Sequence, residues 1–89
     1  MEPLLDSNLP LLKGDLRTIF GKTLKEYRNA KELSQQQLAD FADMDRAYIS
    51  ELERGLLMPS LETFFKLAYQ LKVQPSEFIN KIDQEFKPR

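Results

Sequence analysis

Four residues near the middle of the chain, Arg46, Ala47, Ser50 and Glu51, have side chains and a spacing suited to reading base-pair edges. The guanidinium of Arg46 presents a fork of donors that matches O6 and N7 of guanine in the major groove. Ser50 lies one helical turn further along the same face, where its hydroxyl can reach a base edge or a phosphate. The Ala47 methyl group can meet a thymine methyl, and the Glu51 carboxylate can accept from cytosine N4.

Each of these residues also has a structural interpretation, and the sequence leaves it open. Arg46 can pair with a neighbouring aspartate, although an arginine at a helix N-terminus opposes the helix dipole by ~0.3–1 kcal/mol. Ala47 favours a helix wherever it stands, and Ser50 can be an ordinary surface serine. Glu51 can repel phosphates in wrong registers or pair with a neighbour.

A second group of polar residues is placed to hold the phosphate backbone. The start of a predicted helix after position 34 offers unpaired N–H groups and the positive end of the helix dipole, which together bind anions. The group comprises Ser34, Gln35, Gln36, Tyr48 and Arg54. The alternatives are a packed Tyr48 with its hydroxyl at the surface, and an Arg54 that only interacts with the dipole at a helix C-terminus.

Composition argues against most other chemistry. The 89 residues, 42% hydrophobic and 30% charged, are typical of one globular domain. The sequence lacks both cysteine and histidine, which removes disulfides, thiolate metal sites and the commonest general base. We therefore expect no enzyme, no metal site, no cofactor and no small-molecule ligand. The net charge of −1 argues neither for nor against nucleic acid.

Apolar spacing and capping residues predict an all-α chain of five helices. The first covers about 15–30, where apolar residues recur at helical intervals. Ser34 and Gln37 form a capping box at the start of the second helix. Asp45 is a good N-cap for the third helix, and Gly55 supplies a left-handed stop after it.

The two remaining helices follow the same rules. Ser60 caps a fourth helix, in which Phe64 and Phe65 are expected to lie in the core. Gln74 caps a fifth helix over about 75–86, with a proline at its first position.

The segment of about 34–54 is the most informative, because only about three residues join its two helices. So short a turn forces a steep crossing and requires a small residue on the inner face, which Ala39 provides. Apolar residues then hold the pair together, namely Leu38, Met44, Ile49 and Leu52. This pattern predicts a helix-turn-helix whose second helix, 45–54, leaves its first turn exposed.

The run LSQQQLADFADMDRAYISELERGLLMPSLETFFKLAYQLKVQPSEF resembles the Xre/Cro/repressor helix-turn-helix family, with a match over roughly 16–80. Its part MDRAYISELERG is most similar to controller proteins of restriction-modification systems. The resemblance implies a compact five-helix lambda-repressor-like domain and a sequence-specific, double-stranded DNA-binding transcription regulator. It also implies a phosphate contact for Gln35 and an internal salt bridge between Arg28 and Glu53.

The chain departs from the family pattern at two places. Asp43 stands where the family usually has a glycine in a left-handed conformation, which aspartate tolerates better than most residues. Leu57 and Met58 occupy a loop where relatives carry basic or polar residues, which argues against phosphate contacts from that loop.

Proteins of this architecture usually bind as two-fold dimers to half-sites about one turn, ~34 Å, apart. We therefore expect a homodimer on a palindromic or pseudo-palindromic operator. Exposed apolar residues of the loop and of helix 75–86 are the interface candidates, since they would otherwise form an apolar patch. They are Leu56, Leu57, Ile82 and Phe86, whereas Phe78 is expected to seal the core.

The chain divides into a leucine-rich leader, 1–14, and the helix-turn-helix domain, 15–89. The leader carries Glu2 and Asp6 before any basic residue, and two prolines interrupt its apolar runs. It is therefore neither a signal peptide nor a membrane span, and we expect a cytoplasmic protein that does not associate with membranes. A protein-interaction module, such as an antitoxin that uses this leader and regulates its own gene, remains the alternative.

Overall fold

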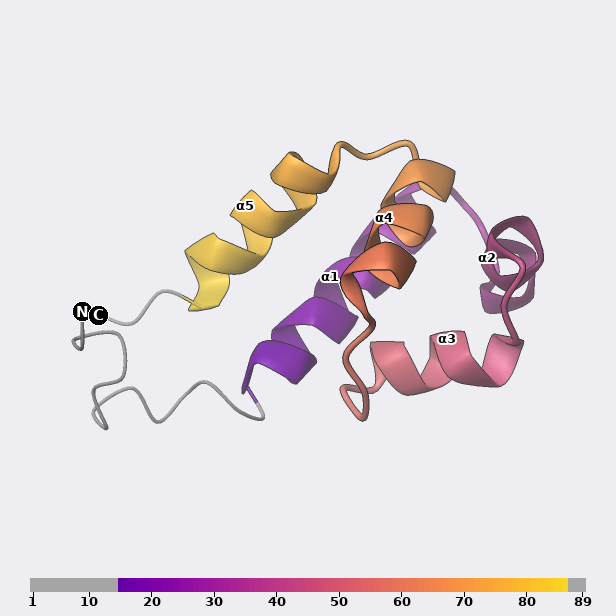
Figure 1. Ribbon diagram of the computed structural model, residues 1–89, viewed down its shortest axis with the longest axis horizontal. Coiled ribbons are helices and arrows are strands. Elements are labelled where there is room, and N and C mark those ends of the chain that lie inside the picture. The colour runs from indigo at the N-terminus through magenta and orange to yellow at the C-terminus, as the bar shows by residue number, and fades with distance from the viewer. Residues whose placement is uncertain (1–14, 87–89) are drawn as a thin grey trace.

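The fold consists of five helices, as the sequence predicts, in a computed structural model that describes residues 15–86. The leader at 1–14 and residues 87–89 lie outside the described residues. The helices are α1 (Asp15–Ala30), α2 (Gln35–Ala42), α3 (Arg46–Glu53), α4 (Leu61–Gln70) and α5 (Pro75–Phe86). Helices α2 and α3 form one end of the domain, and α5 lies at the other (Figure 1). No strand occurs between residues 15 and 86, and no helix there is long and apolar enough to cross a membrane.

Most of the predicted helix ends are confirmed by the backbone. The Ser34 hydroxyl accepts from the Gln37 N–H at 3.0 Å, and the Gln37 side chain accepts from the Ser34 N–H at 2.8 Å. Asp43 and Gly55 adopt left-handed conformations, with φ of 59° and 77° respectively. Asp45 is the N-cap residue of α3, as predicted, although its side chain makes no capping hydrogen bond.

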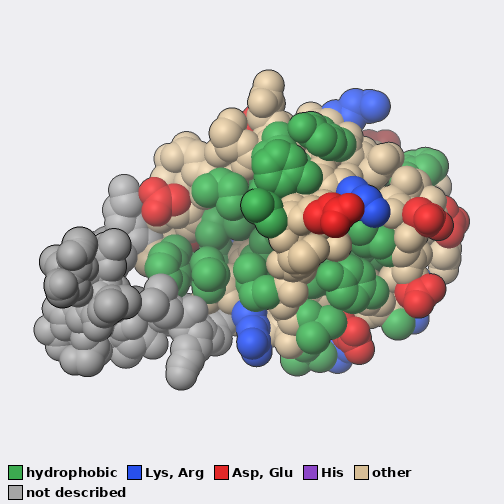
Figure 2. Space-filling model, viewed as in Figure 1, with side chains coloured by type: hydrophobic (Ala, Val, Ile, Leu, Met, Phe, Trp, Pro, Cys, Tyr) green, Lys and Arg blue, Asp and Glu red, His purple; other side chains and the backbone are tan. Residues whose placement is uncertain are grey.

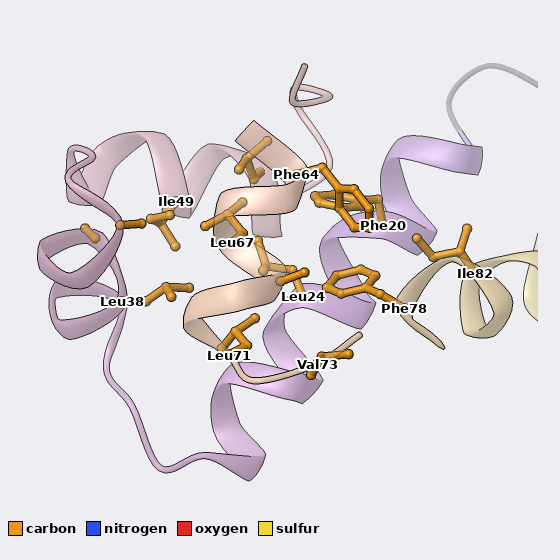
Figure 3. Packing of buried hydrophobic residues seen from close by; sticks show 14 residues of the cluster. Phe20, Leu24, Leu38, Ile49, Phe64, Leu67, Leu71, Val73, Phe78 and Ile82 are labelled. Atoms are coloured by element: carbon orange, nitrogen blue, oxygen red, sulfur yellow. The ribbon is translucent and has the colours of Figure 1, made fainter. Parts of the chain in front are cut away.

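The core draws side chains from all five helices around a group of aromatic rings (Figure 3). Phe20 of α1 stacks on Phe78 of α5 with ring centroids 5.5 Å apart, and Phe64 of α4 meets Phe78 edge-on at 5.1 Å. Such pairs contribute ~0.5–1.5 kcal/mol beyond the burial of their surface. Leu24 and Leu67 are fully buried beside them, so α1, α4 and α5 form one support for the α2–α3 pair.

Two expectations about apolar residues are corrected by this packing. Phe65 is 39% exposed, because a rotation of about 100° per residue turns it away from its buried neighbour Phe64. Ile82 is only 7% exposed and belongs to the core, so little of its side chain is left to contact a second copy. It lies one turn after the buried Phe78 and shares its face. Phe86, a further turn on, is half-buried.

Gly21 is required where α1 crosses the end of α3. A Cβ atom at this position would collide with the Leu52 carbonyl oxygen and lie 2.6 Å from the Glu53 carbonyl oxygen. Both obstacles are backbone atoms that cannot rotate away, and overpacking of this kind costs ~1–3 kcal/mol or more. We expect Gly21→Ala to lower the free energy of unfolding by about 2 kcal/mol or more in urea denaturation. Asn29→Ala, on the exposed part of α1, is the control and should leave stability within ~0.5 kcal/mol.

Candidate nucleic-acid interface

The turn between α2 and α3 fixes the position of the exposed helix. The Met44 N–H donates to the Ala39 carbonyl at 2.8 Å across the left-handed Asp43. Ala39 is fully buried, which is consistent with its predicted role as the small residue at the crossing. The turn therefore holds the N-terminus of α3 at the surface while its middle enters the core.

Helix α3 has one buried side and one exposed side. Ile49 and Leu52 are fully buried. At about 100° per residue, Ser50 lies about 40° around the helix from Arg46, and Ala47 about 100° from it. Arg46 and Ala47 are exposed and Ser50 is partly exposed, so three of the four predicted base-reading residues lie on the side facing away from the core. The spacing of an amphipathic helix accounts for this arrangement.

The other DNA contacts predicted for this region differ in how far their side chains are exposed. Glu51 is half-buried and sits at the border of the exposed side. Tyr48 is also half-buried and packs against the core, as its structural interpretation requires. Arg54 is exposed at the C-cap of α3.

A buried ion pair anchors the C-terminal end of α3 to α1. Arg28 donates to both carboxylate oxygens of Glu53, at 2.6 and 2.9 Å, and to the Leu33 carbonyl at 2.7 Å. The two side chains are 9% and 3% exposed. The hydrogen bond with Glu53 raises the pKa of Arg28, against the opposing effect of burial. Arg28 and Glu53 therefore form the internal salt bridge that the family resemblance implies.

Gln35 connects this ion pair to the exposed side of α3. Its amide nitrogen donates to Glu53 Oε1 at 2.9 Å, and its amide oxygen accepts from Arg46 Nη1 at 3.2 Å. A hydrogen-bonded path thus leads from Arg28 in the core to Arg46 at the surface. The sequence predicts a phosphate contact for Gln35 but not these bonds, because residues 18 and 11 positions away in the chain carry no periodic signal.

The remaining polar residues at the start of α2 bond within that helix. The Ser34 hydroxyl is used by the capping box, and the Gln36 amide donates to Asp40 at 2.9 Å. A phosphate contact from Gln36 would therefore require its exposed side chain to leave Asp40.

The comparison with protein families identifies this arrangement. Residues 24–78, which include all of α2, α3 and α4, match the family model HTH_3, described as Helix-turn-helix. The chain belongs to the helix-turn-helix family.

Relatives of this helix-turn-helix chain include controllers of restriction-modification systems. The control protein C.BamHI of Bacillus amyloliquefaciens is 34% identical over 70 residues, which cover 78% of this chain and 86% of that protein. The restriction-modification controller protein C.AhdI of Aeromonas hydrophila is 42% identical with a TM-score of 0.67, covering 70% of this chain and 94% of that one. A third, C.Esp1396I, has been solved as a tetramer with its natural 35-base-pair operator. It is 25% identical with a TM-score of 0.74, covering 82% of this chain and 96% of that one.

Proposed function

We propose that this helix-turn-helix protein is a sequence-specific double-stranded DNA-binding transcription regulator, with α3 in the major groove. The observation that carries the proposal is the exposed side of α3, where Arg46, Ala47 and Ser50 lie together opposite the buried Ile49 and Leu52. An α-helix fits the major groove, and these side chains match the donors, acceptors and methyl groups found there. Glu51 contributes at the border by accepting from cytosine or by repelling phosphate.

Phosphates on either side of the groove position the helix in this proposal. The first turn of α2, with Ser34, Gln35 and Gln36, contacts one strand through side chains and backbone N–H groups. Arg54, at the C-cap of α3, and the hydroxyl of Tyr48, in its first turn, contact further phosphates. Since most of these groups are uncharged, we expect specific recognition to depend more on geometry than on net charge.

The protein acts as a homodimer on a palindromic or pseudo-palindromic operator, in the cytoplasm and without catalysis. Exposed apolar side chains along the α3–α4 loop, α4 and α5 support this, because a monomer would leave them in water. They comprise Leu56, Leu57, Met58, Leu61, Phe65 and Ile79, with the half-buried Phe86 at one end. The similarity to three controller proteins supports the same role in a restriction-modification system.

Phe65→Ser tests the dimer surface. Phe65 lies on the exposed side of α4, so its loss should weaken dimerisation at least ten-fold while leaving the helices intact. Sedimentation equilibrium measures the dimer, and circular dichroism checks the fold. Phe41→Ser is a matched control, since Phe41 is 55% exposed on α2 and belongs to a different surface. Equal dissociation constants for the two variants would contradict this placement of the interface.

Selection of bound duplexes from a random DNA pool, at two salt concentrations, tests the function as a whole. A two-fold symmetric motif that persists at the higher salt is the expected result, because base contacts rather than counterion release then supply the specificity. Folded protein that enriches no motif at low salt would overturn the proposal and favour a protein partner.

A further inference from the structure

An apolar groove runs along the domain between the first turn of α1, the loop before α4, and α5. It has a volume of about 210 Å³, and its lining is Leu16, Phe20, Met58, Pro59, Ser60, Leu61, Phe64, Ile79 and Ile82. Among residues 15–86, Ser60 is the one polar residue that lines the groove, and no charged side chain does so. Hydrophobic side chains gather over this region of α4 and α5 in Figure 2. A comparably apolar cavity of about 150 Å³ holds benzene, so this groove has room for a leucine side chain.

A second hollow of about 510 Å³ continues the groove over the outer side of α4 and α5. The two share Leu61, Phe64 and Ile79, but the outer one is also lined by Ser76, Asn80 and Asp83. The lining of the inner groove is therefore the less polar of the two. The outer hollow, lined by Leu61, Phe65 and Ile79 among others, is part of the proposed dimer surface.

The leader of this same chain has the composition and the reach to fill the inner groove. Residues 9–12 read Leu-Pro-Leu-Leu, an uncharged apolar run that matches the uncharged lining. Three residues lie between Leu12 and Leu16 at the edge of the groove, so the four steps of extended chain span at most roughly 14 Å. A segment tethered this closely has an effective concentration on the order of millimolar, which few separate partners reach.

We propose that Leu9, Leu11 and Leu12 dock into the inner groove of their own protomer and thereby compete with dimerisation. The competition arises because Leu61 and Ile79 line both the inner groove and the outer hollow. When the leader covers them, a second copy loses part of the surface on which it packs. The leader thus sets the protein concentration at which the dimer forms. Docking of the leader depends on the inner groove alone, whereas its competition with dimerisation rests on the proposed dimer surface.

A pair of introduced cysteines tests whether the leader docks in the inner groove. The sequence has no native cysteine, so only the introduced pair can form a disulfide. Leu11→Cys is combined with Met58→Cys in the full chain, and oxidation is followed in dilute, DNA-free protein. The control combines Leu11→Cys with Arg17→Cys, which is exposed on the first turn of α1 and closer along the chain. A disulfide requires Cα atoms within about 7 Å. Only a leader docked in the inner groove therefore favours the bond to position 58 over the bond to position 17.

We expect the Met58 pair to form an intramolecular disulfide at least ten-fold faster than the Arg17 pair. Equal rates, a faster Arg17 pair, or bonds only between chains would overturn the proposed docking of the leader. None of these outcomes depends on DNA binding, so a failure here is distinguishable from a failure of the proposed function.

Sedimentation equilibrium of the full chain tests the competition. Leu9→Ser, Leu11→Ser and Leu12→Ser together should lower the dimer dissociation constant at least five-fold, because a second copy then meets an uncovered groove. Leu4→Ser with Leu5→Ser is the control and should leave the constant unchanged. A triple variant whose dimer is no tighter than that of the parent would overturn the competition.

Discussion

Arg46→Ala is expected to reduce operator affinity by about 10- to 100-fold for each half-site and to remove the preference for one base in each half-site. A bidentate arginine–guanine contact discriminates by ~1–3 kcal/mol, and a factor of ten corresponds to ~1.4 kcal/mol. A homodimer loses the contact twice, so the loss in a symmetric operator exceeds that in a single half-site. The measurement is repeated selection from random duplexes, followed by titration of the preferred operator.

The control for Arg46 is Arg17→Ala, which removes a cation of the same type from the exposed first turn of α1. It should leave the selected motif unchanged and alter affinity by less than about three-fold. If the Arg46 variant selected the parental motif at reduced affinity, the side chain would be a phosphate contact. If it bound like the parent, the structural interpretation of Arg46 would hold.

The elements of the fold were predictable because their signals are local. A capping box needs only Ser34 and Gln37, and the left-handed positions after α2 and α3 follow from residues that tolerate positive φ. The exposed side of α3 was predictable for the same reason, since two residues along a helix correspond to about 200°, which turns Ala47 away from Ile49 and Ser50 away from Leu52.

Features that depend on the packing of distant elements were not predictable. The pattern in α4 placed Phe65 in the core and the pattern in α5 left Ile82 outside it, because two adjacent apolar faces do not reveal which of them meets α1. A side chain at Gly21 would clash with carbonyl groups of α3, a helix distant in the sequence. An isolated glycine in a helical pattern signals such an approach only weakly.

The Arg28–Glu53 ion pair could be inferred from the family resemblance, but the connection through Gln35 to Arg46 could not. That connection requires Glu53 Oε1 to accept from Arg28 and from Gln35 at once, each at 2.9 Å. The geometry depends on how α1, α2 and α3 meet. A contribution of Glu53 to DNA binding, made through Gln35 and Arg46, is therefore a prediction that only the structure provides.

Glu53→Gln is expected to lower the free energy of unfolding by about 3–5 kcal/mol, since it leaves a buried guanidinium without its counter-charge. For a domain of this size, the melting temperature should fall by at least about 12 °C. Glutamine keeps the shape of the side chain and an oxygen that accepts from Gln35, but its NH2 group then replaces Oε2 beside the Arg28 Nε–H, so the change removes the charge and one acceptor together. Thermal denaturation followed by circular dichroism measures the effect, and a fall of less than about 4 °C would contradict it.

The matched control replaces the whole pair, as Arg28→Met with Glu53→Leu. Apolar residues of similar volume avoid the desolvation of two charges, so such replacements are often neutral or stabilising by ~1–4 kcal/mol. The Leu33 carbonyl loses its Arg28 donor, but Leu33 is half-exposed and water can replace the bond. The double variant should therefore unfold at a temperature close to that of the parent.

DNA binding by this stable double variant separates the two roles of Glu53. Its Gln35 amide has lost its acceptor and no longer fixes the Arg46 guanidinium, so operator affinity should fall several-fold although the fold is intact. Adding Arg46→Ala to the double variant should then cost less than Arg46→Ala costs in the parent, because interacting residues give non-additive losses. Additive losses would mean that Gln35 does not transmit the position of the ion pair to α3, and that Glu53 serves stability alone.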